Sequence, residues 1–281
     1  MLARAKINLY LHVVGKRPDG YHLLDSLIVF ADCGDEVTAT SADDLSLRID
    51  GPFAAGLSAE ADNLVLRAAK GLRDLCRVDR GAAIRLTKNL PVASGIGGGS
   101  ADAAATLKAL IDLWGVRPDR AELCDLALQL GADVPVCLDG RPSFIGGIGE
   151  DIAPAGVLPE AHLLLVNPRV PTLTPQVFKA RAGGFSQPAR WARAPGSSKE
   201  LGGALAARGN DLTDAAITVA PIIREVLATI AATPDCLLAR LSGSGATCFG
   251  IYDSAATAEA ARRAVLATRP NWWGVAAPMA N

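Results

Sequence analysis

The sequence PVASGIGGGSAD at residues 91–102 places four glycines within five positions, directly before a segment with helical periodicity. From Ser100 the apolar positions 107, 110, 111 and 114 mark a helix that Gly115 ends. Glycine lets backbone N–H groups approach an anion, and a helix N-terminus favours negative charge. We therefore expect an anion-binding loop in which the Ser100 hydroxyl caps the helix or contacts a phosphate or its metal. The alternative is a flexible loop with an ordinary N-cap.

The two common phosphate-binding motifs do not fit this loop. A P-loop requires GxxxxGK[ST], but Ser100 follows Gly99 directly and no lysine comes after it. The dinucleotide fingerprint GxGxxG fits Gly95 and Gly97 and then meets Ser100 in place of the third glycine. A nucleotide bound here would be gripped by the loop backbone, and its charged partners would come from elsewhere in the chain.

The rest of the sequence predicts a mixed α+β chain of two domains, with a boundary near residue 155 (domains 1–155 and 156–281). Period-two alternation and apolar runs predict strand material at 1–13, 23–40, 81–91, 162–168 and in the strand, glycine turn and strand of 236–253. Helical spacing marks 63–76, 100–115, 119–130, 210–232 and 256–268. The stretch rich in Gly, Pro and Ser at 183–203 is expected to be a long surface loop.

Composition excludes several classes of function. The net charge of −1 is dispersed, and no apolar run approaches the roughly 20 residues of a membrane span. We therefore expect no nucleic-acid partner, no membrane partner and no obligatory protein partner. The six cysteines form no CxxC pair and no zinc spacing with the three histidines, which favours a reducing compartment. The N-terminus does not read as a signal peptide, so we expect a cytoplasmic protein.

PVASGIGGGSADAA resembles the second signature of the GHMP kinases, P-x-x-x-G-x-G-x-x-S-[SA], small-molecule kinases that bind ATP. ARAKINLYLHVVGKRPDGYH at the N-terminus, GADVPV at 131–136 and LSGSGAT at 241–247 are similar, in the same order, to one branch of that family. The resemblance implies an N-terminal domain like ribosomal protein S5 domain 2 and a ferredoxin-like C-terminal domain. It also implies transfer of the ATP γ-phosphate to the 2-hydroxyl of 4-diphosphocytidyl-2-C-methyl-D-erythritol, a small cytidyl diphosphate, in non-mevalonate isoprenoid biosynthesis.

Two charged residues are the candidate catalytic pair. Lys6 lies on the polar face of the first predicted strand, and by itself it reads as a solvated edge charge. Asp133 lies in the apolar stretch LGADVPVCL, where a carboxylate is costly unless it has a partner, and its simpler role is a turn or N-cap aspartate. The resemblance implies that Lys6 stabilises phosphoryl oxygens and that Asp133 is the general base for the acceptor hydroxyl.

Further candidates are assigned by the same resemblance. For the acceptor these are Asn8 on methylerythritol, Thr174, and Tyr21, His22 and Phe178 around cytosine. For ATP they are the loop residues Pro91, Val92, Ala93, Ser94, Gly95, Ile96, Gly97, Gly98, Gly99, Ser100 and Ala101, with Asn63 and Lys88 near the adenine and its sugar. A second glycine turn, Ser242, Gly243, Ser244 and Gly245, is expected to support the phosphate region or to be a tight hairpin.

The chain departs from the family pattern in a few places. Ala101 stands where a second serine is frequent, and Ser94 replaces a small apolar residue or glycine. No clear match to the magnesium-binding glutamate of some members is found, so Mg²⁺ is expected with ATP while its protein ligands are unknown. Asp102 is one option, although an aspartate in the first turn more often compensates the helix dipole.

Two other functions compete with this expectation. One is a GHMP kinase acting on mevalonate, homoserine or a sugar, which has no use for a pyrimidine clamp. The other is a non-catalytic nucleotide-binding module, which would tolerate loss of Lys6 or Asp133. Protein kinases are excluded because the HRD and DFG elements are absent.

Overall fold

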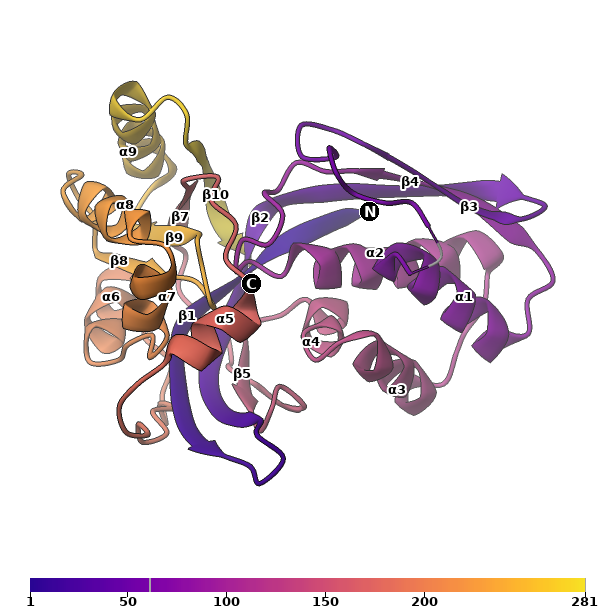
Figure 1. Cartoon of the computed structure of the whole chain (residues 1–281), viewed down its shortest axis with the longest axis horizontal. Helices are drawn as coiled ribbons and strands as arrows, with labels where there is room; N and C mark the ends of the chain where they lie inside the picture. The colour runs from indigo at the N-terminus through magenta and orange to yellow at the C-terminus, as the bar shows by residue number, and fades with distance from the viewer. Residues whose placement is uncertain (61, 281) are drawn as a thin grey trace. The chain divides into compact units, whose positions relative to one another are not determined.

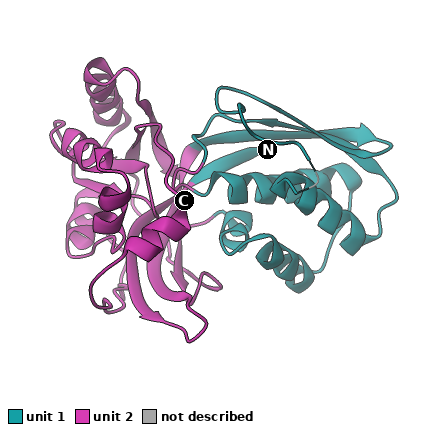
Figure 2. Ribbon diagram, in the orientation of Figure 1, with its two compact units in different colours: residues 1–5, 33–92, 97–140 teal, residues 6–32, 93–96, 141–281 magenta. Residues whose placement is uncertain are grey.

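The computed structural model describes residues 1–60 and 62–280. They divide into two compact units, each built from separate stretches of chain (Figure 2). Unit 1 comprises residues 1–5, 33–92 and 97–140, and unit 2 comprises residues 6–32, 93–96 and 141–281. This division does not follow one break in the sequence, and the boundary expected near residue 155 stays a prediction.

Unit 1 is a sheet with helices on one face (Figure 1). Its strand β4 (Gly81–Thr87) runs antiparallel to the end of β2 (His22–Ala42) and parallel to β3 (Leu45–Asp50). The parallel strands are connected through α1 (Leu64–Cys76), which buries Val65, Ala68, Ala69 and Leu72 along one face, as its helical spacing predicts. The helical layer continues with α2 (Gly98–Trp114), α3 (Arg120–Leu130) and α4 (Val134–Asp139).

Unit 2 contains an antiparallel sheet with the strand order β10–β7–β9–β8. These strands are β7 (His162–Asn167), β8 (Leu238–Leu241), β9 (Cys248–Tyr252) and β10 (Trp273–Ala280), and α8 (Ile222–Ala231) and α9 (Ala255–Thr268) pack on them. In chain order this is strand, helices, two strands, helix and strand. That is the ferredoxin-like arrangement expected for the C-terminal part.

The remainder of unit 2 surrounds the N-terminal strands. β1 (Leu2–Lys16) begins in unit 1 and continues in unit 2, and both of its faces are buried from residue 5 to residue 13. The first half of β2 pairs with β5 (Ser143–Gly146), which in turn pairs with β6 (Asp151–Pro154). The helices α5 (Thr174–Ala180), α6 (Ser198–Ala206) and α7 (Thr213–Val219) complete the unit. The predicted α+β class is confirmed.

Two expectations about the second half need correction. The loop predicted over 183–203 ends early, because α6 begins at Ser198. Ser197 accepts from the Glu200 N–H at 3.2 Å, and the S-x-x-E spacing was a readable helix-start signal. The helix predicted over 210–232 is instead α7 and α8, separated near Pro221, which has no N–H to continue a helical ladder.

Candidate active site

The middle of the glycine-rich loop packs against the second glycine turn within unit 2. Ser242 Oγ donates to Gly95 O at 3.0 Å, and the Thr247 N–H donates to Ser94 O at 3.0 Å. Gly95 has φ +76°, and a Cβ on it would lie 2.5 Å from Ser242 O and 2.6 Å from Gly245 N. Only glycine fits so close to another backbone. The structure therefore brings together two motifs that are far apart in the sequence: Ser242 and Gly95 are separated by 147 residues.

Two polar residues of β1 lie at the same place. Lys6 and Asn8 are 5% and 4% exposed, so Lys6 is not a solvated edge charge. The Lys6 N–H donates to Ile96 O at 3.0 Å, and Lys6 Nζ donates to Asn8 Oδ1 at 3.2 Å. The Asn8 N–H donates to Ser242 Oγ at 3.3 Å, and its carboxamide donates to Ser26 at 2.8 Å. A buried ammonium thus adjoins the phosphate-type loop in unit 2.

The end of the loop enters α2 within unit 1, and the helix begins earlier than predicted. Gly97 is the N-cap, with φ 63° and ψ 22° in the left-handed region, and Gly98 is the first helical residue. Ser100 is therefore the third residue of the helix, and its predicted N-cap role is wrong. The first intrahelical bond runs from the Ala101 N–H to Gly97 O at 2.9 Å. The N–H groups before Ala101 have no acceptor inside the helix, which suits an anion.

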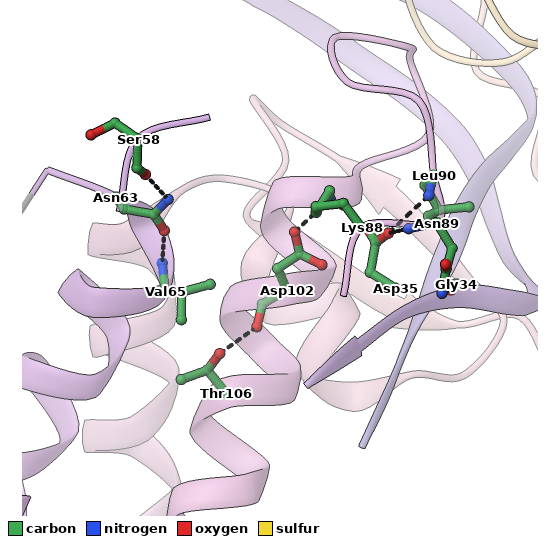
Figure 3. A network of polar contacts seen from close by, with 10 residues as sticks. All are labelled: Gly34, Asp35, Ser58, Asn63, Val65, Lys88, Asn89, Leu90, Asp102 and Thr106. Atoms are coloured by element: carbon green, nitrogen blue, oxygen red, sulfur yellow. Dashed lines mark hydrogen bonds and ion pairs between the residues drawn. The ribbon is translucent and has the colours of Figure 1, made fainter. Parts of the chain in front are cut away.

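Asn63 and Lys88, the candidates for adenine and its sugar, are engaged by the chain in unit 1 (Figure 3). Asn63 caps α1, because its Oδ1 accepts from the Val65 N–H at 2.9 Å while its Nδ2 donates to Ser58 O at 2.7 Å. Lys88 is 4% exposed, and its ammonium is bonded to the carboxylates of Asp35 and Asp102. These bonds give both residues a role inside the protein.

The expected cytosine-binding residues are all in unit 2, and two of them touch. The rings of His22 and Phe178 stack with their centroids 4.9 Å apart. Burial lowers the pKa of His22 from its ordinary value, and the charges of Lys16 and Arg181 lower it further. Tyr21 is 62% exposed. The two hydroxyls of Thr174 and Ser244 lie 2.8 Å apart, which connects α5 to the second glycine turn.

Asp133 lies half-buried at the start of α4 in unit 1, immediately before Val134. It occupies the N-cap position, yet in the described part of the chain its side chain makes no capping bond to that helix. A capping role for its side chain therefore does not account for Asp133, whereas the simpler turn role stays open, because the Val134 N–H donates to Gly131 O at 3.0 Å across this residue.

Sequence reasoning missed two buried residues that hold these motifs. Asp35 is fully buried and accepts from Lys88. Asn210 donates from Nδ2 to Leu241 O at 2.9 Å and to Gly243 O at 2.8 Å, which fixes the second glycine turn. The available signals were an aspartate in the apolar strand LIVFADCGDEV and an asparagine three residues before the start of α7.

Neither a metal site built by the protein nor a membrane-spanning helix is found in the part of the chain that the structure describes. Within residues 1–60 and 62–280, no group of three or more His, Cys, Asp or Glu side chains is placed to hold a metal ion. The donors present there do not fit a metal cage built by the protein alone. No helix in the same residues has the length and apolar character needed to cross a bilayer.

Comparisons with known proteins decide the family. The family described as GHMP kinases N terminal domain matches residues 63–141, and the one described as GHMP kinases C terminal matches residues 164–271. A protein of Paramagnetospirillum magneticum named 4-diphosphocytidyl-2-C-methyl-D-erythritol kinase is 58% identical over 271 residues, which are 96% of this chain and 95% of that protein. The chain belongs to the 4-diphosphocytidyl-2-C-methyl-D-erythritol kinases of the GHMP kinase family.

Solved structures agree with this placement of the GHMP kinase. A crystal structure of 4-(cytidine 5'-diphospho)-2C-methyl-D-erythritol kinase matches with a TM-score of 0.81 at 32% identity, over 100% of this chain and 99% of that one. Mevalonate kinase of L. major in complex with R-mevalonate matches with a TM-score of 0.72 at 17% identity, over 98% and 94% of the two chains. The second likeness concerns the fold alone. The predicted small-molecule kinase is confirmed.

Proposed function

We propose that this GHMP kinase transfers the γ-phosphate of ATP to the 2-hydroxyl of 4-diphosphocytidyl-2-C-methyl-D-erythritol, giving the 2-phosphate and ADP. The reaction belongs to non-mevalonate synthesis of isopentenyl diphosphate. The observation that carries the proposal is the buried Lys6 ammonium, which donates to Asn8 on the same strand. The backbone of that strand is hydrogen-bonded to Ile96 of the glycine-rich loop. Identity of 58% to a relative of that name supports the acceptor. A division of the chain near residue 155 is part of the same proposal.

Lys6 is proposed to stabilise charge on the transferring phosphoryl group. Phosphoryl transfer leaves little covalent work to a protein, which must place two oxygens in line and neutralise charge. An ammonium held in a buried position does this more effectively than one in water. Asn8 Oδ1 accepts from Lys6 Nζ at 3.2 Å and so restricts where the ammonium can point.

Asp133 is proposed to be the general base. Its carboxylate would accept the proton of the 2-hydroxyl as that oxygen bonds to the γ-phosphorus and the bond to the β–γ bridging oxygen breaks, releasing ADP. Its place before Val134, without a capping bond to α4 in the described chain, supports a role other than holding the helix.

The remaining candidates are proposed as binding residues. Residues 91–101 would hold the ATP phosphates through backbone N–H groups, and the turn of residues 242–245 would support that loop. Cytosine would be recognised by Tyr21, His22 and Phe178, and methylerythritol by Asn8 and Thr174. Contacts of Asn63 or Lys88 with adenine or its sugar would compete with the bonds that both side chains make within the chain.

Mg²⁺ enters the proposal with ATP as part of the substrate. Magnesium in kinase sites usually keeps several waters and binds through one or two carboxylates and substrate phosphates. No step is assigned to a metal held by the protein. We place the reaction in the cytoplasm, which the six free cysteines support, and we propose no nucleic-acid, membrane or obligatory protein partner.

The acceptor is tested by ADP release from Mg-ATP with 4-diphosphocytidyl-2-C-methyl-D-erythritol, mevalonate, homoserine and galactose. We expect the cytidyl substrate to exceed the others by at least ~100-fold in kcat/KM, because a polar site rejects acceptors that leave its groups unpaired. Faster turnover of any other acceptor would overturn the assignment. ADP release that no acceptor stimulates would favour a non-catalytic module.

The general base is tested by Asp133→Asn, which keeps the shape of the side chain and removes its charge. We expect kcat to fall by roughly 10²–10⁴, the usual contribution of a general base. Asp125→Asn is the matched control, because Asp125 is exposed on the neighbouring α3, and it should keep wild-type turnover. Unchanged kcat in Asp133→Asn removes this residue from the mechanism.

A further inference from the structure

A buried cluster of three charged side chains lies in unit 1 beside the start of α2 (Figure 3). Lys88 Nζ is 2.5 Å from Asp35 Oδ2 and 2.7 Å from Asp102 Oδ2. The three residues are at most 4% exposed. Burying two carboxylates and one ammonium carries a large desolvation penalty, and a core with apolar residues of similar volume in their place is often at least as stable. The cluster therefore calls for an explanation beyond stability.

The cluster joins the two chain segments that flank the glycine-rich loop. Lys88 follows β4, immediately before the loop, and Asp102 is in the early part of α2, immediately after it. Asp35 Oδ1 accepts from the N–H groups of Asn89 and Leu90, at 2.6 Å and 2.8 Å. Three successive residues before the loop are thus tied to Asp35, and the Lys88 ammonium connects them to the helix after the loop.

The ammonium also lies close to the first helical residue. A Cβ placed on Gly98 would be 3.5 Å from Lys88 Nζ and 3.7 Å from Asp35 Oδ2. Lys88 Nζ is thus in ordinary contact range of the helix start, where the N–H groups without intrahelical acceptors begin. Moving the ammonium would move the end of the loop that we expect to bind phosphate.

We propose that Asp35, Lys88 and Asp102 form a clamp that fixes the two flanks of the glycine-rich loop to each other, so that they are positioning residues for nucleotide binding. The clamp deepens the proposed function and rests on it, since it takes ATP as the ligand of the loop. It assigns to the Lys88 ammonium an internal role in place of contact with adenine or its sugar.

The two carboxylates of the clamp are not equivalent. Asp35 accepts from Lys88 and from two backbone N–H groups, whereas Asp102 Oδ1 is buried with no hydrogen-bond partner among the described residues. Burial raises the pKa of Asp102 to about 7, with the Asp35 charge adding to the rise and Lys88 opposing it. Asp102 therefore acts mainly as an acceptor for Lys88. An asparagine can supply that acceptor, and an alanine cannot.

The test compares Asp102→Ala with Asp102→Asn by calorimetric ATP binding and by steady-state kinetics of the full chain. Asp102→Ala should raise the Kd and the KM for ATP by at least about tenfold. The kcat and the KM for the acceptor should change by less than about threefold, because the variant loses a positioning residue and not a reacting group. Asp102→Asn should restore the ATP Kd to within about threefold of wild type, because it keeps the acceptor. Trp114→Phe is the stability control, since Trp114 is buried at the far end of α2 and donates to Gly81 O at 3.3 Å.

Three outcomes would overturn the clamp. One is Asp102→Ala binding ATP as tightly as wild type or more tightly, as expected if a released Lys88 contacts the nucleotide. Another is Asp102→Ala and Trp114→Phe changing every kinetic constant alike. A third measurement needs no variant: the Asn89 and Leu90 amides should be protected from hydrogen exchange without nucleotide, and rapid exchange would contradict a preformed clamp. Wild-type protein that binds no ATP would refute the proposed function itself.

Discussion

The imidazole of His22 and the phenyl ring of Phe178 stack in unit 2, with their centroids 4.9 Å apart and their planes 23° from parallel. The pair connects the first residue of β2 to α5. Each ring covers one face of the other, so a pyrimidine must use an outer face or displace one ring. Of the two rings, Phe178 is the wholly apolar one, so we expect it to contribute most of the apolar contact with the base.

Phe178→Ala should therefore weaken binding of the cytidyl substrate. Stacking of a base on an aromatic ring is worth roughly 1–3 kcal/mol, so we expect the KM for the cytidyl substrate to rise by roughly 5–150-fold and the ATP KM to change little. Phe185→Ala is the matched control, because Phe185 is 53% exposed and contacts Arg181. An equal rise in both KM values would show that Phe178 supports the fold rather than the base.

Two glycines of the same loop should respond in opposite ways to alanine. A Cβ on Gly95 would meet the backbone of Ser242 at 2.5 Å, whereas a Cβ on Gly99 would have nothing within 4 Å. Gly95→Ala should therefore lower the unfolding temperature. Gly99→Ala should raise the free energy of unfolding by about 0.5–1 kcal/mol, because alanine favours a helix over glycine.

ATP binding separates fold from function at these two positions. If phosphate approaches the backbone at Gly99, Gly99→Ala should raise the ATP Kd by about tenfold or more while stabilising the protein. Thermal unfolding and calorimetric titration with ATP measure both effects on one sample. A Gly99→Ala protein that is more stable and binds ATP normally would show that phosphate does not approach this residue.

The sequence correctly predicted those helices whose apolar spacing and capping residues lie within or next to the helix itself. The helix expected over 63–76 is α1, and the one expected over 119–130 is α3, which begins after the N-cap Asp119. The start of α2 was misplaced because its N-cap is Gly97 in a left-handed conformation rather than a serine. A glycine run contains no local signal that distinguishes one such residue from the next.

Contacts between residues that are far apart in the chain could not be predicted from one sequence. Lys88 and Asp35 are 53 residues apart; the sequence suggested Lys88 as a candidate near adenine or its sugar and assigned no role to Asp35. The burial of Lys6 likewise depends on β1 being covered on both faces. The resemblance supplied the candidate residues, and folding supplied the partners that hold them in place.

A segment before α6, residues 186–190, is held to β1 and β2 and should be released by a single substitution. Asp25 is 3% exposed and accepts from Tyr10, from the Ala189 N–H and from Arg190. Asp25→Asn removes the charge and leaves too few acceptors, so the free energy of unfolding should fall by about 1–3 kcal/mol.

The release should be local, and it has a matched control. Hydrogen exchange over residues 186–190 should quicken by more than exchange in β7. Asp151→Asn removes the other carboxylate bonded to Arg190, but that side chain is 61% exposed. It should cost less than about 1 kcal/mol, as exposed ion pairs do. Similar exchange in the two variants would contradict the assigned role of Asp25.

The buried carboxyl of Asp102 should make the free energy of unfolding depend on pH. Burial raises its pKa from 3.8 to about 7, and the groups that face it are Lys88 and Asp35. A carboxyl whose pKa is higher in the folded state than in the unfolded state stabilises the fold fully at pH values below the unfolded-state pKa, and this contribution is lost as the pH rises through the folded-state pKa.

Between pH 4 and 7 the free energy of unfolding of wild type should therefore fall relative to that of Asp102→Asn, by at most about 1.4 kcal/mol per pH unit. Urea unfolding of both proteins across this range gives the difference directly. A difference that rises with pH would mean that Lys88 outweighs burial and keeps Asp102 ionised.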